Sequence, residues 1–134
     1  MKEYTDINEL LPKDKHDDST AEKLMALTDD EISVIMPVLL TWLQDVNWPV
    51  SSVIADVIGK HIRAAAPYIP DILRGTDDMW KYGVVSRVLV RYPVNDKGII
   101  SEIKRLADSP TPSEEEEGVR DAAIKAMKAM ESMI

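Results

Sequence analysis

The densest mixture of titratable side chains lies near the N-terminus, in five consecutive residues: Lys13, Asp14, Lys15, His16 and Asp17. Imidazole changes its charge near neutral pH, and a positioned imidazole can transfer protons to or from a substrate. His16 with Asp14 or Asp17 therefore supports one hypothesis, that of an enzyme. The alternative, which we favour, is a loop that folds back on the rest of the chain through internal ion pairs and holds no catalytic residue.

The small number of histidines limits metal chemistry. His16 and His61 are the two histidines of the chain, and cysteine is absent, whereas a catalytic zinc site takes three protein ligands. The sequence also lacks a phosphate-binding glycine loop, a serine nucleophile elbow and a paired-histidine zinc motif. We therefore expect no metal and no cofactor, and we place His61 on the apolar side of its own helix, with its ring nitrogens hydrogen-bonded.

Two tryptophans stand beside polar residues close to predicted turns. The set that could form a contact surface comprises Asp45, Asn47, Trp48, Trp80, Lys81 and Tyr82. Aromatic anchors with a polar rim are typical of surfaces that bind proteins or peptides. In the alternative interpretation, the indoles wedge between helices and donate their N–H to a backbone carbonyl, while the aspartates cap helices.

The C-terminal segment combines an acidic run with an apolar stripe. Glu114 to Glu117 are expected in the first turn of a helix that runs from about Glu114 towards the end of the chain, because negative charge is favourable at a helix N-terminus. Met127 and Met130 belong to the apolar stripe of that helix. We expect the stripe to be buried over the open end of the fold, and an exposed stripe would be a binding groove or a dimer seam.

All of these residues depend on helices for their position. Apolar residues recur at helical spacing along the chain, as in Ile32, Ile35, Met36, Leu39, Leu40 and Leu43. Three capping boxes are predicted, at Ser19 with Glu22, Thr28 with Glu31, and Ser113 with Glu116. Pro37 is expected to kink its helix or to begin a new one. Because no segment alternates convincingly as a strand, the predicted class is all-α.

The chain also repeats itself. Residues 37–40 begin with a proline and end with two leucines, and a related motif returns 33 residues later at 70–73. Asp45 and Asp78 each follow the last leucine of these motifs by five residues, and Asp108 stands at the same offset in a third copy. One helical hairpin cannot bury its apolar side alone, so neighbouring hairpins stack. We predict a single domain, 1–134, with an N-terminal extension at 1–28 and hairpins at 29–66, 67–95 and 96–134.

The repeat resembles the HEAT-like repeats, in which a proline opens the first helix of each hairpin and an aspartate closes it. That resemblance implies a short α–α superhelix. A narrower resemblance rests on motifs spread over nearly the whole chain: Leu11-Pro12-Lys13-Asp14-Lys15-His16-Asp17, Trp42-Leu43-Gln44-Asp45, Asn47-Trp48-Pro49-Val50 and Trp80-Lys81-Tyr82. These motifs are similar to those of a family of small, mostly bacterial proteins of unknown function that is predicted to be an α–α superhelix. The resemblance implies no catalytic residue.

Composition narrows the classes of partner. The 134 residues carry a net charge of −8, which argues against nucleic acid because phosphate binding requires surplus lysine and arginine. The longest apolar run, 34–40, is far shorter than the roughly 20 residues of a membrane-spanning helix, and no export signal is visible, so we expect a cytoplasmic protein.

Our leading hypothesis is a non-enzymatic module that binds a protein or peptide. The main alternative is an acidic inhibitor, such as an immunity protein, which binds a basic partner. The oligomeric state is left open.

Overall fold

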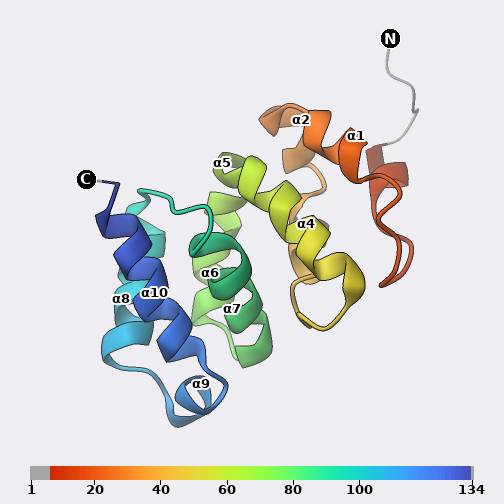
Figure 1. Cartoon of the computed structure of the whole chain (residues 1–134). Coiled ribbons are helices and arrows are strands. Elements are labelled where there is room, and N and C mark those ends of the chain that lie inside the picture. Colours follow the sequence, from red (N-terminus) through yellow and green to blue (C-terminus); the bar gives the residue numbers. More distant parts are fainter. Residues whose placement is uncertain (1–6, 134) are drawn as a thin grey trace.

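The computed structural model describes residues 7–133, and every regular element in this part of the chain is helical, which confirms the predicted all-α class (Figure 1). The elements, in chain order, are η1 (Ile7–Leu10), α1 (Ala21–Ala26), α2 (Asp29–Ser33), α3 (Met36–Thr41), α4 (Pro49–Lys60), α5 (Ile62–Ala65), η2 (Ala66–Tyr68), α6 (Ile69–Arg74), α7 (Asp78–Val84), the π-helix η3 (Val85–Leu89), α8 (Lys97–Asp108), α9 (Pro112–Glu116) and α10 (Val119–Glu131).

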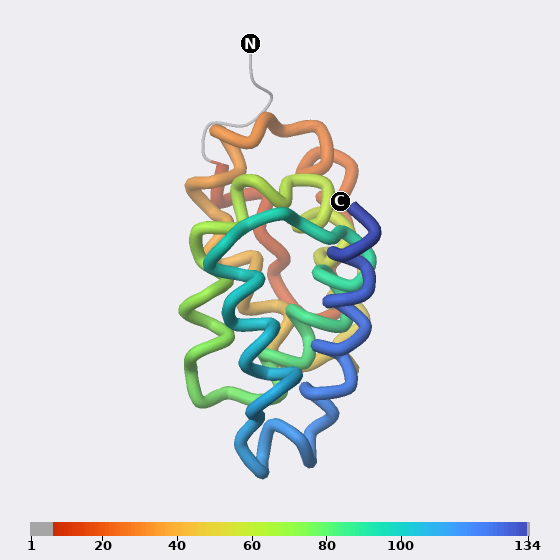
Figure 2. Tube along the Cα trace, turned by 90° about the vertical axis from the view of Figure 1, so that its left-hand side faces the viewer, coloured from red at the N-terminus to blue at the C-terminus, as the bar shows by residue number. Residues whose placement is uncertain are grey.

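The helices form two layers. In each hairpin a helix of one layer packs on the next long helix of the other layer, so that α3 lies against α4, α6 against α7, and α8 against α10. Within a layer, η3 contacts both α4 and α10, and α6 contacts α8. Figure 2 shows α8 and α10 side by side at the front of the stack. This arrangement is compatible with a helical-repeat superhelix, with one apolar core running between the layers.

The helix ends confirm some predictions and correct others. Thr28 and Glu31 form a capping box with both of its hydrogen bonds, as predicted. The capping boxes predicted at Ser19 and Ser113 are wrong. The residue before α1 is Thr20, whose side chain makes no capping hydrogen bond. At α9 the capping box is shifted by two residues from the predicted one and joins Thr111 to Glu114. Pro112 occupies the first helical position of α9, where its missing N–H removes no hydrogen bond of the helix.

Two predicted helices are interrupted. The long apolar stripe around Pro37 divides into α2 and α3, and Pro37 lies in the first turn of α3, which confirms the predicted break. The final helix does not run continuously from Glu114. The predicted helix is divided in two. The first part, α9, ends at Glu116, Gly118 takes a left-handed conformation with φ of 82°, and the second part, α10, begins at Val119. Glycine adopts that conformation without the steric cost a side chain would bring.

Glycine also allows two elements to approach closely. A Cβ atom at Gly83 of α7 would lie 2.1 Å from the carbonyl oxygen of Leu43, so α7 rests directly on the backbone that follows α3. A Cβ atom at Gly59 of α4 would overlap the aromatic ring of Tyr92. At Gly83 the first two hairpins meet backbone to backbone, and at Gly59 the aromatic ring of Tyr92 lies directly on the backbone of α4.

The N-terminal segment lies against the first hairpin. Leu10 and Leu24 are buried in the common core, and α1 packs on α4. His61, at the junction of α4 and α5, is buried, as expected from its position on the apolar stripe. Its Nδ1 lies 2.9 Å from Asp29 Oδ1 and its Nε2 lies 3.1 Å from the carbonyl oxygen of Leu24. The ring therefore connects α1 and α2 to the hairpin behind them. Residues 1–6 of the predicted extension lie outside the described part.

Candidate functional site

The predicted loop at 13–17 is held mainly by backbone hydrogen bonds. The Asp14 carboxylate accepts from the backbone amide of His16 at 2.9 Å, and Asp17 accepts from that of Lys13 at 2.9 Å. Val50, at the start of α4, donates to the carbonyl of Lys15 at 2.8 Å. The bond from Val50 thus joins the loop to the body, and among residues 7–133 the side chains of the loop form none of the expected ion pairs.

Both carboxylates of the loop are engaged by its backbone, and His16 is exposed. Hydrogen bonds from Ser19 and from the backbone of Lys13 hold the pKa of Asp17 below its usual value. Asp17 is therefore a stable anion that shapes the turn. His16 has no carboxylate oriented towards its ring among the hydrogen bonds of residues 7–133.

The turn before α4 positions Asp45, Asn47 and Trp48. The Asp45 carboxylate accepts from the amide of Asn47 at 2.8 Å, so it shapes the turn. Asn47 is exposed. The ring of Trp48 is half-buried and meets Trp42 edge to face, with 5.7 Å between the ring centroids. This geometry is a favourable aromatic pair. It leaves part of the Trp48 ring open to solvent.

Trp80 lies in the first turn of α7 and reaches across to α3. Its Nε1 donates to the carbonyl oxygen of Leu40 at 2.8 Å, and the side chain is half-buried against the core. That contact matches the alternative weighed for the tryptophans, in which the indole wedges between hairpins. Asp77 caps the same turn through the amide of Trp80 at 3.0 Å. The neighbouring Met79 carries the exposed apolar surface of this turn.

Lys81 points inward. Its Nζ donates to Asp78 Oδ1 at 2.8 Å and to Glu114 Oε2 at 2.7 Å, and only 3% of the residue is exposed. Arg105 of α8 reaches the same Glu114 carboxylate through two hydrogen bonds of 3.1 Å. We call these four residues, Asp78, Lys81, Arg105 and Glu114, the charge cluster. It joins α7, α8 and α9.

The charge cluster keeps its side chains ionised. Burial alone would raise the pKa of Glu114, but hydrogen bonds from Arg105, Lys81 and the backbone of Thr111 outweigh it and hold the pKa at about 2. Burial alone would lower the pKa of Lys81, yet its two carboxylate partners raise it above its usual value. A proton shuttle needs a group that gains and loses its proton near neutral pH. The charge cluster instead fixes helices.

Tyr82 borders a shallow groove between the second and third hairpins. The groove has a volume of about 350 Å³ and is lined by Tyr82, Ser86, Val90, Gly118, Asp121, Ala122 and Lys125. The Tyr82 ring packs near Gly118, where an added Cβ would lie 3.5 Å from it. Of the six predicted contact residues, Lys81 is buried, Asn47 is exposed, and the other four are half-buried. Of these four, Trp48 and Tyr82 have no side-chain polar atom engaged in a hydrogen bond that positions a turn or a helix within the described residues.

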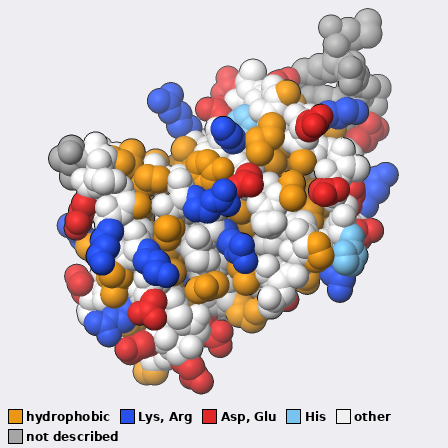
Figure 3. All heavy atoms as spheres, in the orientation of Figure 1, with side chains coloured by type: hydrophobic (Ala, Val, Ile, Leu, Met, Phe, Trp, Pro, Cys, Tyr) orange, Lys and Arg blue, Asp and Glu red, His pale blue; other side chains and the backbone are white. Residues whose placement is uncertain are grey.

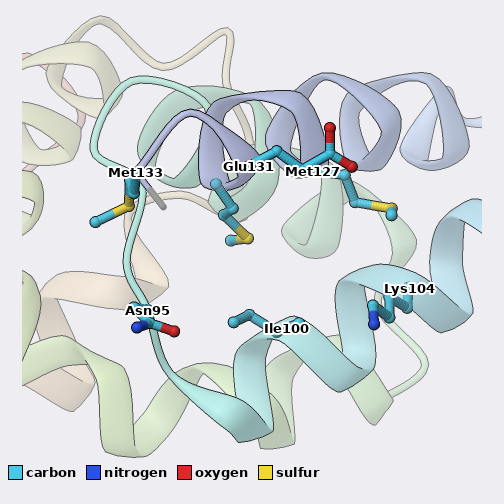
Figure 4. A pocket seen from close by; sticks show the side chains of 7 residues that line it. Asn95, Ile100, Lys104, Met127, Glu131 and Met133 are labelled. Carbon is cyan, nitrogen blue, oxygen red and sulfur yellow. The ribbon is translucent and has the colours of Figure 1, made fainter.

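A more apolar pocket opens on the outer side of the third hairpin, between α8 and α10 (Figure 4). Its volume is about 410 Å³, and its lining residues are Asn95, Ile100, Lys104, Met127, Met130, Glu131 and Met133. In Figure 4, Ile100 points from α8 towards the space below α10, and the carboxylate of Glu131 points away from that space. Flexible methionine side chains make most of the α10 wall.

A second pocket continues from the first. Its volume is about 530 Å³, and it is lined by Ile62, Arg63, Ala66, Pro67, Pro93, Val94, Asn95, Asp96 and Met133. Asn95 and Met133 belong to both pockets. We call the two together the end groove. It runs from α5 and η2, past the segment that joins η3 to α8, to the seam between α8 and α10.

Some polar side chains of the end groove have a hydrogen-bond partner in the chain, and others have none among the described residues. Asp96 caps α8 by accepting from the amide of Ile99 at 2.9 Å. Within residues 7–133, the side chains of Arg63 and Lys104 form no ion pair, and the side-chain carboxamide of Asn95 makes no hydrogen bond. All three residues are exposed. The groove therefore offers apolar walls, the free side-chain amide of Asn95, and charges of both signs, since Asp96 and Glu131 line it together with Arg63 and Lys104.

Sequence reasoning did not identify the end groove. The methionine stripe of the last helix was the available signal, and Met127 and Met130 do line the groove. The stripe is largely buried, as expected: Met130 is buried and Met127 is half-buried. The opening beside them could not be foreseen, because it depends on how far α8 and α10 separate near the connecting segment. The contributions of Ile62 and Pro93 come from segments distant in sequence and carry no local motif.

The described residues hold neither a metal site nor a membrane-spanning helix. No group of three or more His, Cys, Asp and Glu side chains is placed to hold a metal ion in 7–133. None of the helices over the same range is long and apolar enough to cross a membrane.

Comparison with known proteins places the chain at the level of a family. None of the curated proteins compared with the chain matches it. A family described as a domain of unknown function, DUF5071, matches residues 10–127, which include the charge cluster and much of the end groove. This agrees with the expected membership of a family without a known function, and it assigns no repeat class. Because the match spans most of the sequence, the chain belongs to the DUF5071 family of domains of unknown function.

Proposed function

We propose that the protein is a non-enzymatic helical-repeat module that binds a segment of another protein, and that the end groove is its binding surface. The observation that carries this proposal is the apolar opening between α8 and α10, where Ile100, Met127 and Met130 line a pocket of about 410 Å³. Concave, mostly apolar surfaces with a few polar groups are the usual form of a binding site. Methionine walls adapt to side chains of different shape.

The location of the groove supports a macromolecular partner. In Figures 1 and 2, α8 and α10 stand at one end of the stack, with α6 and α7 on their inner side. On the outer side the methionine and isoleucine side chains have no further helix against them within the described chain. An apolar surface at the end of a stack of hairpins suits a segment of another protein, because burying it removes apolar area from water.

Asn47, Trp48 and Tyr82 remain a proposed secondary contact surface. Their exposed parts lie on turns and on the α7–α10 groove, and a large partner could reach them in addition to the end groove. Asp45, Trp80 and Lys81 act through the fold, because their polar atoms are engaged by Asn47, Leu40 and the charge cluster. The HEAT-like classification of the hairpins is part of the same proposal.

Site-specific photo-crosslinking in living cells tests the proposed function. The photoreactive amino acid p-benzoylphenylalanine replaces Lys104 at the rim of the end groove, and a control variant carries it at Glu22, an exposed position on α1. We expect a discrete protein adduct from position 104 and a different pattern from position 22. Mass spectrometry of the adduct identifies the partner, and Met127→Lys should abolish the adduct at 104. Identical adducts at both positions would remove the basis for the proposal.

A second candidate function, inhibition of a basic protein, is favoured by the distribution of charge. Residues 7–66 carry 10 acidic and 5 basic side chains, whereas Lys and Arg gather over α10 in the face drawn in Figure 3. An acidic surface speeds association with a cationic partner at low salt. Asp18, Glu22 and Asp30 are exposed members of that surface.

Neutralising this acidic surface separates the two candidate functions. In the triple variant Asp18→Asn, Glu22→Gln, Asp30→Asn, the association rate with an inhibited basic partner should fall several-fold at low salt and approach that of wild type at high salt. The matched control neutralises Glu116 and Glu117, which are exposed at the end of α9. If the partner associates with wild type and with both variants at the same rate, it is not recognised through this acidic surface. The cytoplasmic location and the absence of membrane and nucleic-acid partners remain predictions.

A further inference from the structure

Beyond the proposed function, we propose that His61 is a proton-dependent latch. Its ring is held as the doubly protonated imidazolium, and in that form it joins α1 and α2 to the hairpin that carries α4 and α5. The latch belongs to the chain alone and does not depend on what the end groove binds.

The two neighbours of the ring set its charge. Nδ1 lies 2.9 Å from Asp29 Oδ1, and Nε2 lies 3.1 Å from the carbonyl oxygen of Leu24. A carboxylate and a carbonyl oxygen only accept hydrogen bonds, whereas a neutral imidazole has one N–H and one bare nitrogen. The neutral ring can therefore make one of the two bonds, and its other nitrogen sets a lone pair against an oxygen. The imidazolium donates to both.

Burial makes the second bond important. Only 7% of the His61 side chain is exposed, so water has little access to a nitrogen that loses its partner. A buried polar atom without a partner costs free energy. The Asp29 carboxylate supplies the charge opposite to that of the imidazolium, and a hydrogen bond between such groups is stronger than one between neutral groups.

The backbone holds the ring in this place. His61 lies at the junction of α4 and α5, where its amide donates to the carbonyl oxygens of Val57 and Ile58. Its own carbonyl oxygen accepts from the amides of Ala64 and Ala65. Because the backbone is bonded on both sides, the ring projects from a fixed point towards α1 and α2.

Asp29 is the carboxylate within hydrogen-bond distance of the ring. The other charged side chains on α1, α2 and η3 are Glu22, Lys23, Asp30, Glu31 and Arg87. All of these are exposed except Glu31 and Arg87, which are half-buried, and Glu31 accepts from the amide of Thr28. Lys60 and Arg63, which flank His61, are exposed, as is the phenol-bearing Tyr68 of η2. The helix α3 carries no charged side chain.

The consequence is a docking of the N-terminal helices that depends on pH. α1 packs on α4 and α2 packs on α5. The docked chain binds one more proton at His61 than a chain in which these helices have separated and the ring is neutral. The free energy of docking therefore falls as the pH rises.

NMR of the imidazole nitrogens tests the charge of the ring on the full-length protein. A neutral ring gives two widely different ¹⁵N shifts, and an imidazolium gives two similar ones. In a titration from pH 5 to pH 9, the two shifts of His61 should stay similar after those of His16, an exposed histidine, have separated. In Asp29→Asn the new carboxamide can donate to the ring, so the shifts of His61 should separate at lower pH than in the wild type. Asp30→Asn, at the exposed next residue of α2, should leave the pattern of His61 unchanged.

Hydrogen exchange tests the docking. The amides of Leu24 and Ile32 donate within the first turns of α1 and α2, and Ala126 is buried in α10. Between pH 6.5 and pH 9, the protection of the first two amides, corrected for intrinsic exchange, should fall at least tenfold relative to that of Ala126. The Asp29→Asn variant should show no such relative fall.

Three outcomes would overturn the inference. One is a pair of His61 shifts that separates together with the pair of His16 or before it. Another is an equal loss of protection in the wild type and in Asp29→Asn. The third is an Asp30→Asn variant that behaves as Asp29→Asn does, because the effect then follows from the net charge of α2 and not from the contact with the ring.

Discussion

The charge cluster and the end groove lie towards opposite ends of the third hairpin and use their polar groups in opposite ways. In the charge cluster, Lys81 and Glu114 are buried and each of the four charged side chains pairs with at least one of opposite charge. In the end groove, Arg63, Asn95 and Lys104 are exposed and have no such partners within the described residues. Figure 1 shows this separation, with α9 at the bottom and the C-terminal end of α10 at the top.

The comparison teaches where to seek function in a molecule of this kind. A buried charge must be paired, since an unpaired one costs several kcal/mol, so strong electrostatics at the charge cluster serve folding. Groups with spare hydrogen-bonding capacity beside apolar surface contribute little to folding and remain available to a partner. The four predictions below test that division of roles.

Removal of the central carboxylate should have the largest effect. Glu114→Ala leaves Lys81 and Arg105 facing each other without their shared partner, and breaking a buried pair costs about 3–5 kcal/mol. We expect a loss of that size in the free energy of unfolding, measured by urea denaturation. Glu115→Ala removes an exposed carboxylate that pairs with Arg120 at 3.2 Å and should cost less than about 1 kcal/mol. Similar losses in both variants would contradict the special role of the charge cluster.

Acid should weaken the charge cluster in a defined range of pH. The pKa of Glu114 is lowered from 4.5 to about 2 in the folded protein. A depressed pKa adds stability above pH 4.5, and this part is lost as the pH falls towards 2, on the order of 3 kcal/mol. Lys81 adds nothing to this acid limb, because its raised pKa acts only at high pH.

Urea denaturation at pH 7 and pH 3 measures this loss. Glu114→Gln should lose clearly less stability between these two values than the wild type. Glu115→Gln serves as the control and should keep the wild-type dependence on pH. A Glu114→Gln variant with an unchanged acid limb would show that other carboxylates produce it.

The floor of the end groove should contribute moderately to stability. Met130 is 8% exposed and packs on the core, so Met130→Ala removes buried apolar contacts. Because the new space opens to solvent instead of leaving a closed cavity, we expect a loss of about 1–2 kcal/mol, at or below the usual range for buried methionine. Met133→Ala, at a position that is 50% exposed, should change unfolding by less than about 0.5 kcal/mol. Equal losses would mean that the groove is closed in solution.

The rim of the end groove should be neutral for folding. Asn95→Ala and Lys104→Ala remove side chains without described partners, so each should shift the free energy of unfolding by less than about 0.5 kcal/mol. Asn95→Ala should also reduce the adduct formed by the crosslinker at position 104. A large loss of stability in either variant would mean that these groups already have partners, and would end the contrast with the charge cluster.

Most of the fold could be predicted from the sequence, because it is encoded in local patterns. The apolar spacing around Leu39 and Leu40, the proline at 37 and the capping box at Thr28 each report on a few consecutive residues. The boundary of α10 could not be predicted in this way. Glutamate is a good helix former and favours a first turn, yet Glu114 turns inward to Lys81 and Arg105, and Gly118 then ends the short helix. Tertiary contacts decided where the helix begins.

The candidate site was less accessible to sequence reasoning. Trp48 and Trp80 suggested one contact surface because both lie near turns. However, the indole N–H of Trp80 donates to the carbonyl oxygen of Leu40, and Lys81 is buried. Nothing in the spacing of these residues reveals which side of the helix faces the core. The end groove combines Arg63, Asn95 and Met133, which are separated by 32 and 38 residues, so only the folded chain brings them together.

The stack of hairpins also has a direction. On one side α1 already packs on α4, whereas on the other side Ile100 and Met127 are only half-buried between α8 and α10. An additional helical hairpin grafted by design after Met133 would cover these two side chains, and it would thereby close the end groove to any other partner.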